Sequence, residues 1–90
     1  MFKTLEELIT IIRQRKDSSS CESYTNKLLN NKKLSVEKVK EEIAELINAI
    51  EKNTNKVHES ADVLYHLMVL LEANGIKIED VMDELKKRQK

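Results

Sequence analysis

The 90-residue sequence has no proline or tryptophan, one glycine and one cysteine. With Cys21 as the single thiol, no disulfide or cysteine-rich zinc site can form within this chain, and a reducing cytoplasm is the expected compartment. Basic and acidic residues number 16 each, which argues against the broad basic surface of a nucleic-acid-binding domain. No apolar run approaches the roughly 20 residues that a membrane span needs. We therefore expect a small cytoplasmic domain that binds neither nucleic acid nor membrane.

The residues that are abundant, Glu, Lys and Leu, favour helices. We expect an all-α fold in which residues 1–90 form one domain, an antiparallel bundle completed by dimerisation. Five helices are expected: one starting at Thr4, then Ser23–Leu29, Ser35–Lys52, Lys56–Asn74 and Ile78–Lys87.

Several short segments carry the signals of helix ends and turns. Thr4 and Glu7 fit a capping box at the start of the first helix. Residues 17–22 are small and polar and indicate a loop, and residues 30–33 are expected to end the second helix. The turn at residues 53–55 makes the two longest helices antiparallel neighbours, and Gly75 is a natural C-terminal cap.

The helix expected at residues 56–74 has apolar side chains on every side, from Val63 to Leu71. A helix of this kind must be buried on every side, and a chain this short has little else to cover it. We expect it to pack against its copy in a second subunit. The alternative is a monomer in which the other helices surround it. In the last helix, an inward-facing stripe is expected: Val81, Met82 and Leu85.

Two pairs of acids lie on either side of the turn at residues 53–55. Glu42 and Glu45 are three residues apart on one expected helix, and Glu59 and Asp62 repeat that step on the next. Asp62 lies in an otherwise apolar helix, where an isolated carboxylate is unfavourable. Carboxylates that converge in a cleft suit a hard divalent cation, with Mg²⁺ first and Mn²⁺ second.

Acid pairs at three-residue spacing are also common on solvated helix faces, and Lys38 and Lys56 are available to neutralise them instead. A metal ion held by carboxylates usually retains waters and binds phosphate oxygens. Such an ion polarises a phosphoryl group and lowers the pKa of bound water. The chemistry predicted for this site is hydrolysis of a phosphoric anhydride or ester.

Three segments resemble a known family. Residues 23–29 are similar to its S-Y-T-x-x-L-L stretch, residues 38–45 to K-V-G-E-E-x-x-E, and residues 59–67 to E-x-A-D-L-L-Y-H-L, with Lys40 in place of the family glycine. The sequence thus resembles phosphoribosyl-ATP pyrophosphohydrolase, the second enzyme of histidine biosynthesis. That family lies within the wider all-α group of nucleotide pyrophosphatases that includes the MazG-like proteins.

The resemblance implies hydrolysis of phosphoribosyl-ATP to phosphoribosyl-AMP and pyrophosphate by a metal-associated water. It implies a magnesium ion bound by the four acids of the two pairs, and catalytic roles for Glu41, Glu42 and Glu45, although Glu41 is equally well an exposed helix charge. His66 is expected either to hydrogen-bond a ligand carboxylate or to pack in the core, and His58 to lie on the surface. Five residues are candidates for binding the substrate: Tyr24, Thr25, Lys27, Lys38 and Arg13.

Two other functions remain open at this point. One is a MazG-like pyrophosphatase that acts on ordinary nucleoside triphosphates, since the acidic segments are shared across the superfamily. The other is a helical dimerisation module without catalytic activity, whose acids are paired with lysines. The S-Y-T and Y-H-L segments are more particular to the histidine-pathway branch and favour phosphoribosyl-ATP as substrate.

Overall fold

The computed structural model of the chain describes residues 2–16 and 23–89. These residues form helices and their connections, with no strand among them, which confirms the predicted all-α fold. The helices are α1 (Lys3–Lys16), α2 (Tyr24–Leu29), α3 (Lys32–Lys52), α4 (Lys56–Ala73) and α5 (Ile78–Arg88). The loop expected at residues 17–22, with Cys21, lies outside the described residues. Within the described ranges no helix is long and apolar enough to cross a membrane.

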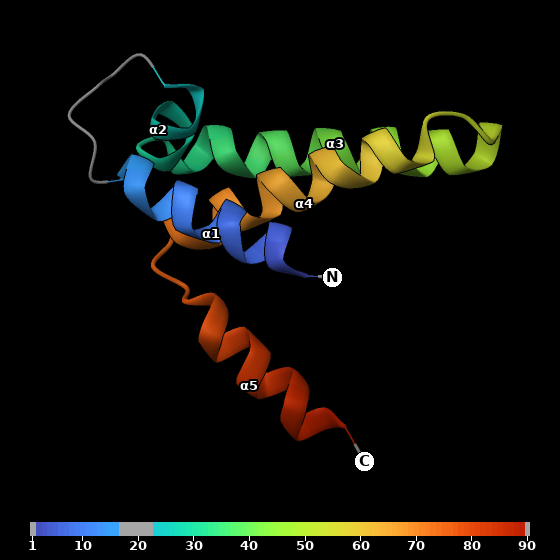
Figure 1. The fold of residues 1–90 in the computed structure, drawn as a ribbon. Coiled ribbons are helices and arrows are strands. Elements are labelled where there is room, and N and C mark those ends of the chain that lie inside the picture. Colours follow the sequence, from blue (N-terminus) through green and yellow to red (C-terminus); the bar gives the residue numbers. More distant parts are fainter. Residues whose placement is uncertain (1, 17–22, 90) are drawn as a thin grey trace.

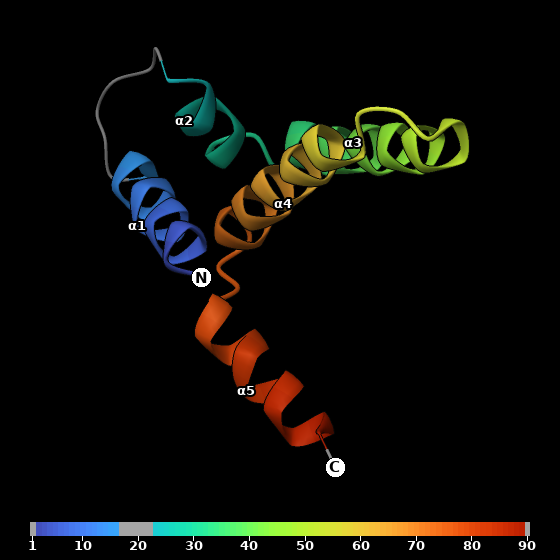
Figure 2. The ribbon, with the colours of Figure 1, turned by 45° about the vertical axis from the view of Figure 1, so that its right-hand side comes forward.

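The antiparallel pair of α3 and α4 forms the longest part of the molecule (Figures 1 and 2). Helices α1 and α2 pack against α4 at the end of the pair that lies away from the α3–α4 turn. Helix α5 points away from the other four helices in both views. The expected pairing of the two longest helices is therefore confirmed.

The hydrophobic core lies where α1, α2 and α4 meet. Its buried members are Ile12, Leu28, Leu29, Met68, Val69 and Ala73. Two buried polar side chains join the surrounding helices: Asn26 Nδ2 donates to the Arg15 carbonyl at 2.8 Å, and Ser35 Oγ donates to the Leu28 carbonyl at 2.6 Å. Because buried polar groups are costly unless hydrogen-bonded, these contacts fix how α2 sits between α1 and α3.

Two asparagines make the tight reversal between α3 and α4. Asn53 ends α3 and Asn55 precedes α4, and both adopt the left-handed conformation, with φ of 56° and 45°. Asparagine tolerates this region better than most residues with a side chain. The Asn53 side chain also accepts a hydrogen bond from Lys56 Nζ at 2.6 Å. The turn sets the two long helices side by side, and the acid pairs on them can face each other.

Two predicted helix starts were wrong. Thr4 lies inside α1, which begins at Lys3, and so it is not the N-cap. Helix α3 begins at Lys32 because the Asn31 side chain accepts a hydrogen bond from the Leu34 amide, so residues 32–33 belong to α3 and Ser35 lies within it. At the predicted start of α2, Ser23 does cap the helix and accepts from the Asn26 amide.

The inward orientation predicted for the last helix was also wrong for Met82 and Leu85, which are each 48% exposed, whereas Val81 is half-buried. The apolar spacing identified one face of α5 but carried no information about what covers that face. Near its start, α5 is tied to α1 by Arg13, whose guanidinium donates to both carboxylate oxygens of Glu79 at 2.9 and 2.6 Å. This ion pair lowers the pKa of Glu79 to about 2, mainly through the hydrogen bond from Arg13.

Replacement of Asn53 tests the turn. Asn53→Ala is expected to destabilise the protein by about 1 kcal/mol, since the left-handed conformation costs most residues roughly 1–2 kcal/mol and alanine lacks the short polar side chain that lets asparagine adopt it. Asn53→Gly should keep most of the stability, because glycine adopts this conformation freely. Thermal unfolding followed by circular dichroism measures both. Equal losses in the two variants would show that the contact with Lys56 matters more than the backbone conformation.

Candidate metal centre

Side chains of the two acid pairs meet between α3 and α4. One carboxylate oxygen from each of Glu42, Glu45 and Glu59 lies within 4.8 Å of the others. Asp62 is close enough for its charge to raise the pKa values of Glu42 and Glu59. Three of the four predicted ligands therefore converge, and Asp62 lies beside them in a group with Glu59 and His58.

No lysine or arginine nitrogen of the described residues lies within 4.0 Å of a carboxylate oxygen of these four acids. The two lysines that offered a competing explanation have other partners. Lys38 Nζ lies 3.4 Å from Glu41 Oε2, and Lys56 Nζ donates to Asn53. The four acids are thus held together without direct neutralisation by lysine or arginine.

Burial adds to the cost of this arrangement. Oε2 of Glu42 and Oε2 of Glu59 are buried and have no hydrogen-bond partner. Desolvation raises the pKa of both carboxyl groups, and the neighbouring Glu45 carboxylate raises each further. A cation bound among these oxygens would remove both penalties, so the donor set and its unpartnered oxygens fit a hard divalent ion. An open pocket beside them is lined by Glu45, Asn48, Ala49, Thr54, Asn55 and Glu59.

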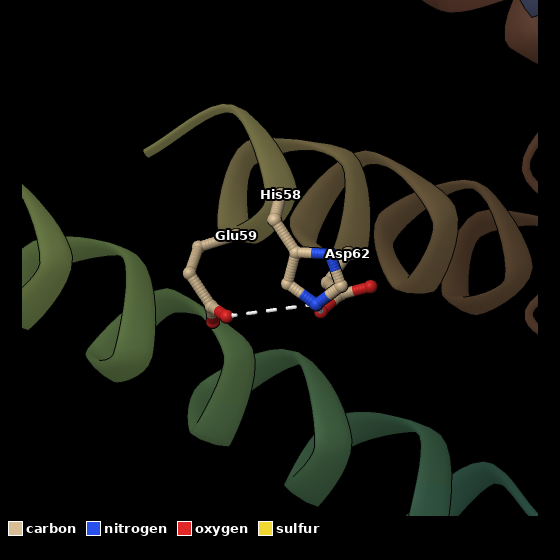
Figure 3. Close-up of side chains that lie close together, drawn as sticks. All are labelled: His58, Glu59 and Asp62. Carbon is tan, nitrogen blue, oxygen red and sulfur yellow. Dashed lines mark ion pairs between the residues drawn. The ribbon is translucent and has the colours of Figure 1, made fainter. Parts of the chain in front are cut away.

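His58 lies at the outer edge of the cluster (Figure 3). Its side chain is 73% exposed, as expected of a surface residue, yet Nε2 is 3.4 Å from Asp62 Oδ2 and 3.9 Å from Glu59 Oε1. No role at the site was predicted for His58. The signal that would have found it is the four-residue step from His58 to Asp62, which places both on one face of α4.

His66 is buried and packs beside the acids rather than bonding their carboxylates. Its Nδ1 lies 2.9 Å from the Asp62 main-chain carbonyl, an acceptor, so Nδ1 carries the proton. In the neutral ring Nε2 then accepts a hydrogen bond from the Tyr24 hydroxyl, 3.1 Å away. The packed-histidine alternative is therefore the one observed.

The hydroxyl groups of Tyr24 and Thr25 face the Tyr65–His66 pair of α4. Thr25 Oγ1 is hydrogen-bonded to the Tyr65 hydroxyl, and the Tyr65 and His66 rings meet edge to face with centroids 4.9 Å apart. Burial raises the pKa of the Tyr24 hydroxyl. Two segments that are well separated in the sequence thus form one contact surface.

The remaining predicted site residues differ in how near they lie to the acids. Lys38 and Glu41 pair with each other on α3, close enough to Glu42 for its charge to raise the pKa of Lys38. Lys27 is exposed on α2. Arg13 is not brought to the acids: it bonds Glu79, and its Nε lies 3.4 Å from Glu72 Oε1. The structure therefore gives Arg13 the role of linking α1 to α4 and α5.

Together, these features describe an all-α protein with an acidic centre between two antiparallel helices. The sequence model described as phosphoribosyl-ATP pyrophosphohydrolase matches residues 5–89. This chain belongs to that family, and the resemblance seen in its three segments is confirmed.

Relatives of similar length agree with this assignment. The phosphoribosyl-ATP pyrophosphatase of Methanoculleus marisnigri is 41% identical, covering 96% of this chain and 94% of the relative. The protein of the same name from Clostridium novyi is 43% identical, covering 96% and 81%. The chain also matches the histidine biosynthesis bifunctional protein hisIE, chloroplastic, of Arabidopsis thaliana at 42% identity over 94% of its length, but spans only 33% of that relative.

The unneutralised acids predict an unusual effect of removing one charge. Because the folded-state pKa of Glu42 is raised above its ordinary 4.5, folding binds protons and stability falls as the pH rises from about 4.5 through the folded-state pKa. In a chelating buffer at pH 7, Glu42→Gln is expected to raise Tm. This advantage should shrink as the pH falls toward 4.5.

Thermal unfolding of the two proteins across pH measures the effect, with Glu37→Gln as control, since Glu37 is exposed on the same helix. A Tm for Glu42→Gln that stays below that of the unsubstituted protein at every pH would mean that repulsion at the cluster is not significant.

Proposed function

We propose that this chain acts in the cytoplasm on phosphoribosyl-ATP through a magnesium ion held by Glu42, Glu45, Glu59 and Asp62. Membership of the family gives the substrate and the bond that breaks. Water hydrolyses the phosphoric anhydride between the α- and β-phosphates of phosphoribosyl-ATP, giving phosphoribosyl-AMP and pyrophosphate. This is the second step of histidine biosynthesis, and the chain is a hydrolase.

The observation that supports the metal most strongly is the pair of buried, unpartnered oxygens on Glu42 and Glu59. Groups of this kind are rare in folded proteins because an unsatisfied buried acceptor is costly. A divalent ion among them would satisfy both. Such an ion supplies Lewis-acid polarisation of phosphate oxygens and a more acidic bound water.

The protein's own contribution is to hold carboxylates in place and to accept a proton. Hydrolysis consumes a water molecule, whose proton must leave as oxygen bonds to phosphorus. Glu42 and Glu45 would hold the ion and orient the water bound to it, and a carboxylate oxygen that is not bound to the ion would accept the proton. Glu41, which is exposed and paired with Lys38, is further from this role.

Lys38 is the cation best placed to meet the substrate's phosphates. It lies one turn before Glu42 on α3, and the carboxylates around it raise its pKa, so it stays protonated at neutral pH. Tyr24 lies near enough for the charge of Lys38 to act on the pKa of its hydroxyl, lowering it against the larger effect of burial. We assign Lys38, Tyr24 and Thr25 to the substrate side of the centre, with Lys27 a further cation on α2.

Removal of one proposed ligand should abolish most of the activity. Loss of even an outer-sphere partner of a metal costs about 10–100-fold, so Glu42→Gln and Asp62→Asn are each expected to lower kcat/KM by at least about a hundredfold. Pyrophosphate release from phosphoribosyl-ATP with excess Mg²⁺ measures this. In the unsubstituted protein Mg²⁺ should also raise Tm, because a ligand that binds only the folded form stabilises it.

Glu37→Gln serves as the matched control, since this acid lies on the same helix but outside the cluster. Near-normal activity of Glu42→Gln and Asp62→Asn would show that these acids do not bind the catalytic ion. Absence of any Mg²⁺ effect on both Tm and turnover would exclude magnesium as the ion.

We also propose that the chain is a homodimer or a higher homo-oligomer. Large apolar side chains remain exposed on the α3–α4 pair, and Ile43, Ile47 and Ile50 share one face of α3. Leu64 on α4 is 47% exposed although its helix is apolar on every side. Exposed apolar side chains that share a helix face are typical of a protein–protein interface. A second copy would bury it and enlarge a core that is small for independent stability.

Charged substitutions test the proposed interface. Ile47→Asp and Leu64→Asp are expected to shift the protein toward the monomer, since each would place a carboxylate in a buried apolar contact. Analytical ultracentrifugation measures the mass. Lys33→Asp, at the exposed start of α3, is the control for a change in charge. A monomeric unsubstituted protein at micromolar concentration would contradict the proposal.

A further inference from the structure

We propose that His58, Glu59 and Asp62 form a second divalent-ion site, at the solvent edge of the acidic centre, and that its nitrogen donor favours Zn²⁺ over Mg²⁺. One ligand atom from each residue lies within 4.8 Å of the others. The three side chains come from the first two turns of α4 and converge on one side of it (Figure 3). The inference rests on the proposed function in that it assigns Glu59 and Asp62 a share in both sites.

The distances fit ligands around one small ion. Zn²⁺ binds nitrogen and oxygen at about 2.0–2.2 Å, so two ligands of a tetrahedral ion are about 3.4 Å apart. His58 Nε2 is 3.4 Å from Asp62 Oδ2 and 3.9 Å from Glu59 Oε1. Small side-chain rotations would bring all three atoms into a first coordination shell.

Glu59 can contribute to both sites because its two carboxylate oxygens lie in different surroundings. Its Oε1 lies toward His58, whereas its Oε2 is buried and without a partner. The same residue also belongs to the group formed with Glu42 and Glu45. One carboxylate can therefore contribute one oxygen to the inner centre and the other to the edge site.

The two sites differ in the ion they should prefer. The inner group offers only carboxylate oxygens, which suit Mg²⁺. The edge group adds an imidazole, which suits Zn²⁺ and related transition metals better than it suits Mg²⁺. Because His58 is 73% exposed, three protein ligands would leave a position open to solvent.

A common helix-surface contact is the alternative: a protonated His58 paired with Asp62 four residues later, with no metal. That contact involves two residues. The approach of Glu59 Oε1 to 3.9 Å adds a third possible ligand atom, and the 39% exposure of the Asp62 side chain leaves it accessible to an ion from solvent.

The experiment compares the unsubstituted protein, His58→Asn and Glu42→Gln by calorimetric titration with Zn²⁺ and with Mg²⁺. Loss of a direct ligand should cost at least the 10–100-fold typical of outer-sphere partners, so His58→Asn is expected to bind Zn²⁺ about tenfold or more weakly. Its Mg²⁺ affinity should be unchanged. Glu42→Gln should show the opposite pattern, losing Mg²⁺ and keeping Zn²⁺. Arg88→Gln, which removes an exposed ion pair at the same four-residue spacing on α5, is the control.

Nuclear magnetic resonance gives a direct readout, because the chain has only two histidines. Zn²⁺ should shift the ring ¹⁵N signal of His58 Nε2, and Mg²⁺ should leave it in place. Equal Zn²⁺ affinity in the unsubstituted protein and His58→Asn, or a His58 signal that ignores Zn²⁺, would overturn the proposal. So would equal loss of Zn²⁺ binding in His58→Asn and Glu42→Gln, since that would mean a single site. If Mg²⁺ binds none of the proteins while the Zn²⁺ results hold, the magnesium centre fails and the edge site stands.

Discussion

The carboxylates held between α3 and α4 repel one another, and the surrounding structure keeps them together in spite of this repulsion. The two helices could reduce it by rotating their acids toward solvent, but the Asn53–Asn55 turn and the packing of α4 against α1 and α2 fix their facing sides. The cost appears as raised pKa values at Glu42 and Glu59. Unfavourable arrangements of this kind cluster at functional sites, where binding of a ligand can offset the repulsion.

The short helix α2 serves the same centre from the other side. Six residues are too few for a helix that is stable alone, so α2 depends on its contacts. Ser23 caps it, Leu28 and Leu29 enter the core, and the hydroxyls of its first turn reach Tyr65 and His66. Because His66 in turn bonds the Asp62 main chain, a change in α2 is transmitted directly to the helix that carries two of the acids.

Most of the fold and the acid cluster followed from periodicity. The two helices that carry the acids are 21 and 18 residues long and leave a strong pattern, in which Glu42, Glu45, Glu59 and Asp62 stand at fixed helical steps. The features that were missed depend on contacts between distant residues. Arg13 looked available for phosphate, but Glu72 and Glu79 approach it only in the folded chain. The spacing of Met82 and Leu85 identified an apolar face of α5 but did not show whether another helix covers it. The start of α3 depended on a single side-chain cap at Asn31, which spacing does not reveal.

The acidic centre is made by one uninterrupted helical hairpin. Its four carboxylates need only the chain between Glu42 and Asp62 to be brought together, so loop closure costs little and the centre can assemble early in folding. A unit of this kind is also portable, because joining it to another polypeptide at either end leaves the hairpin intact. The Arabidopsis relative, in which the matching segment is a third of a longer protein, has the organisation that such portability allows.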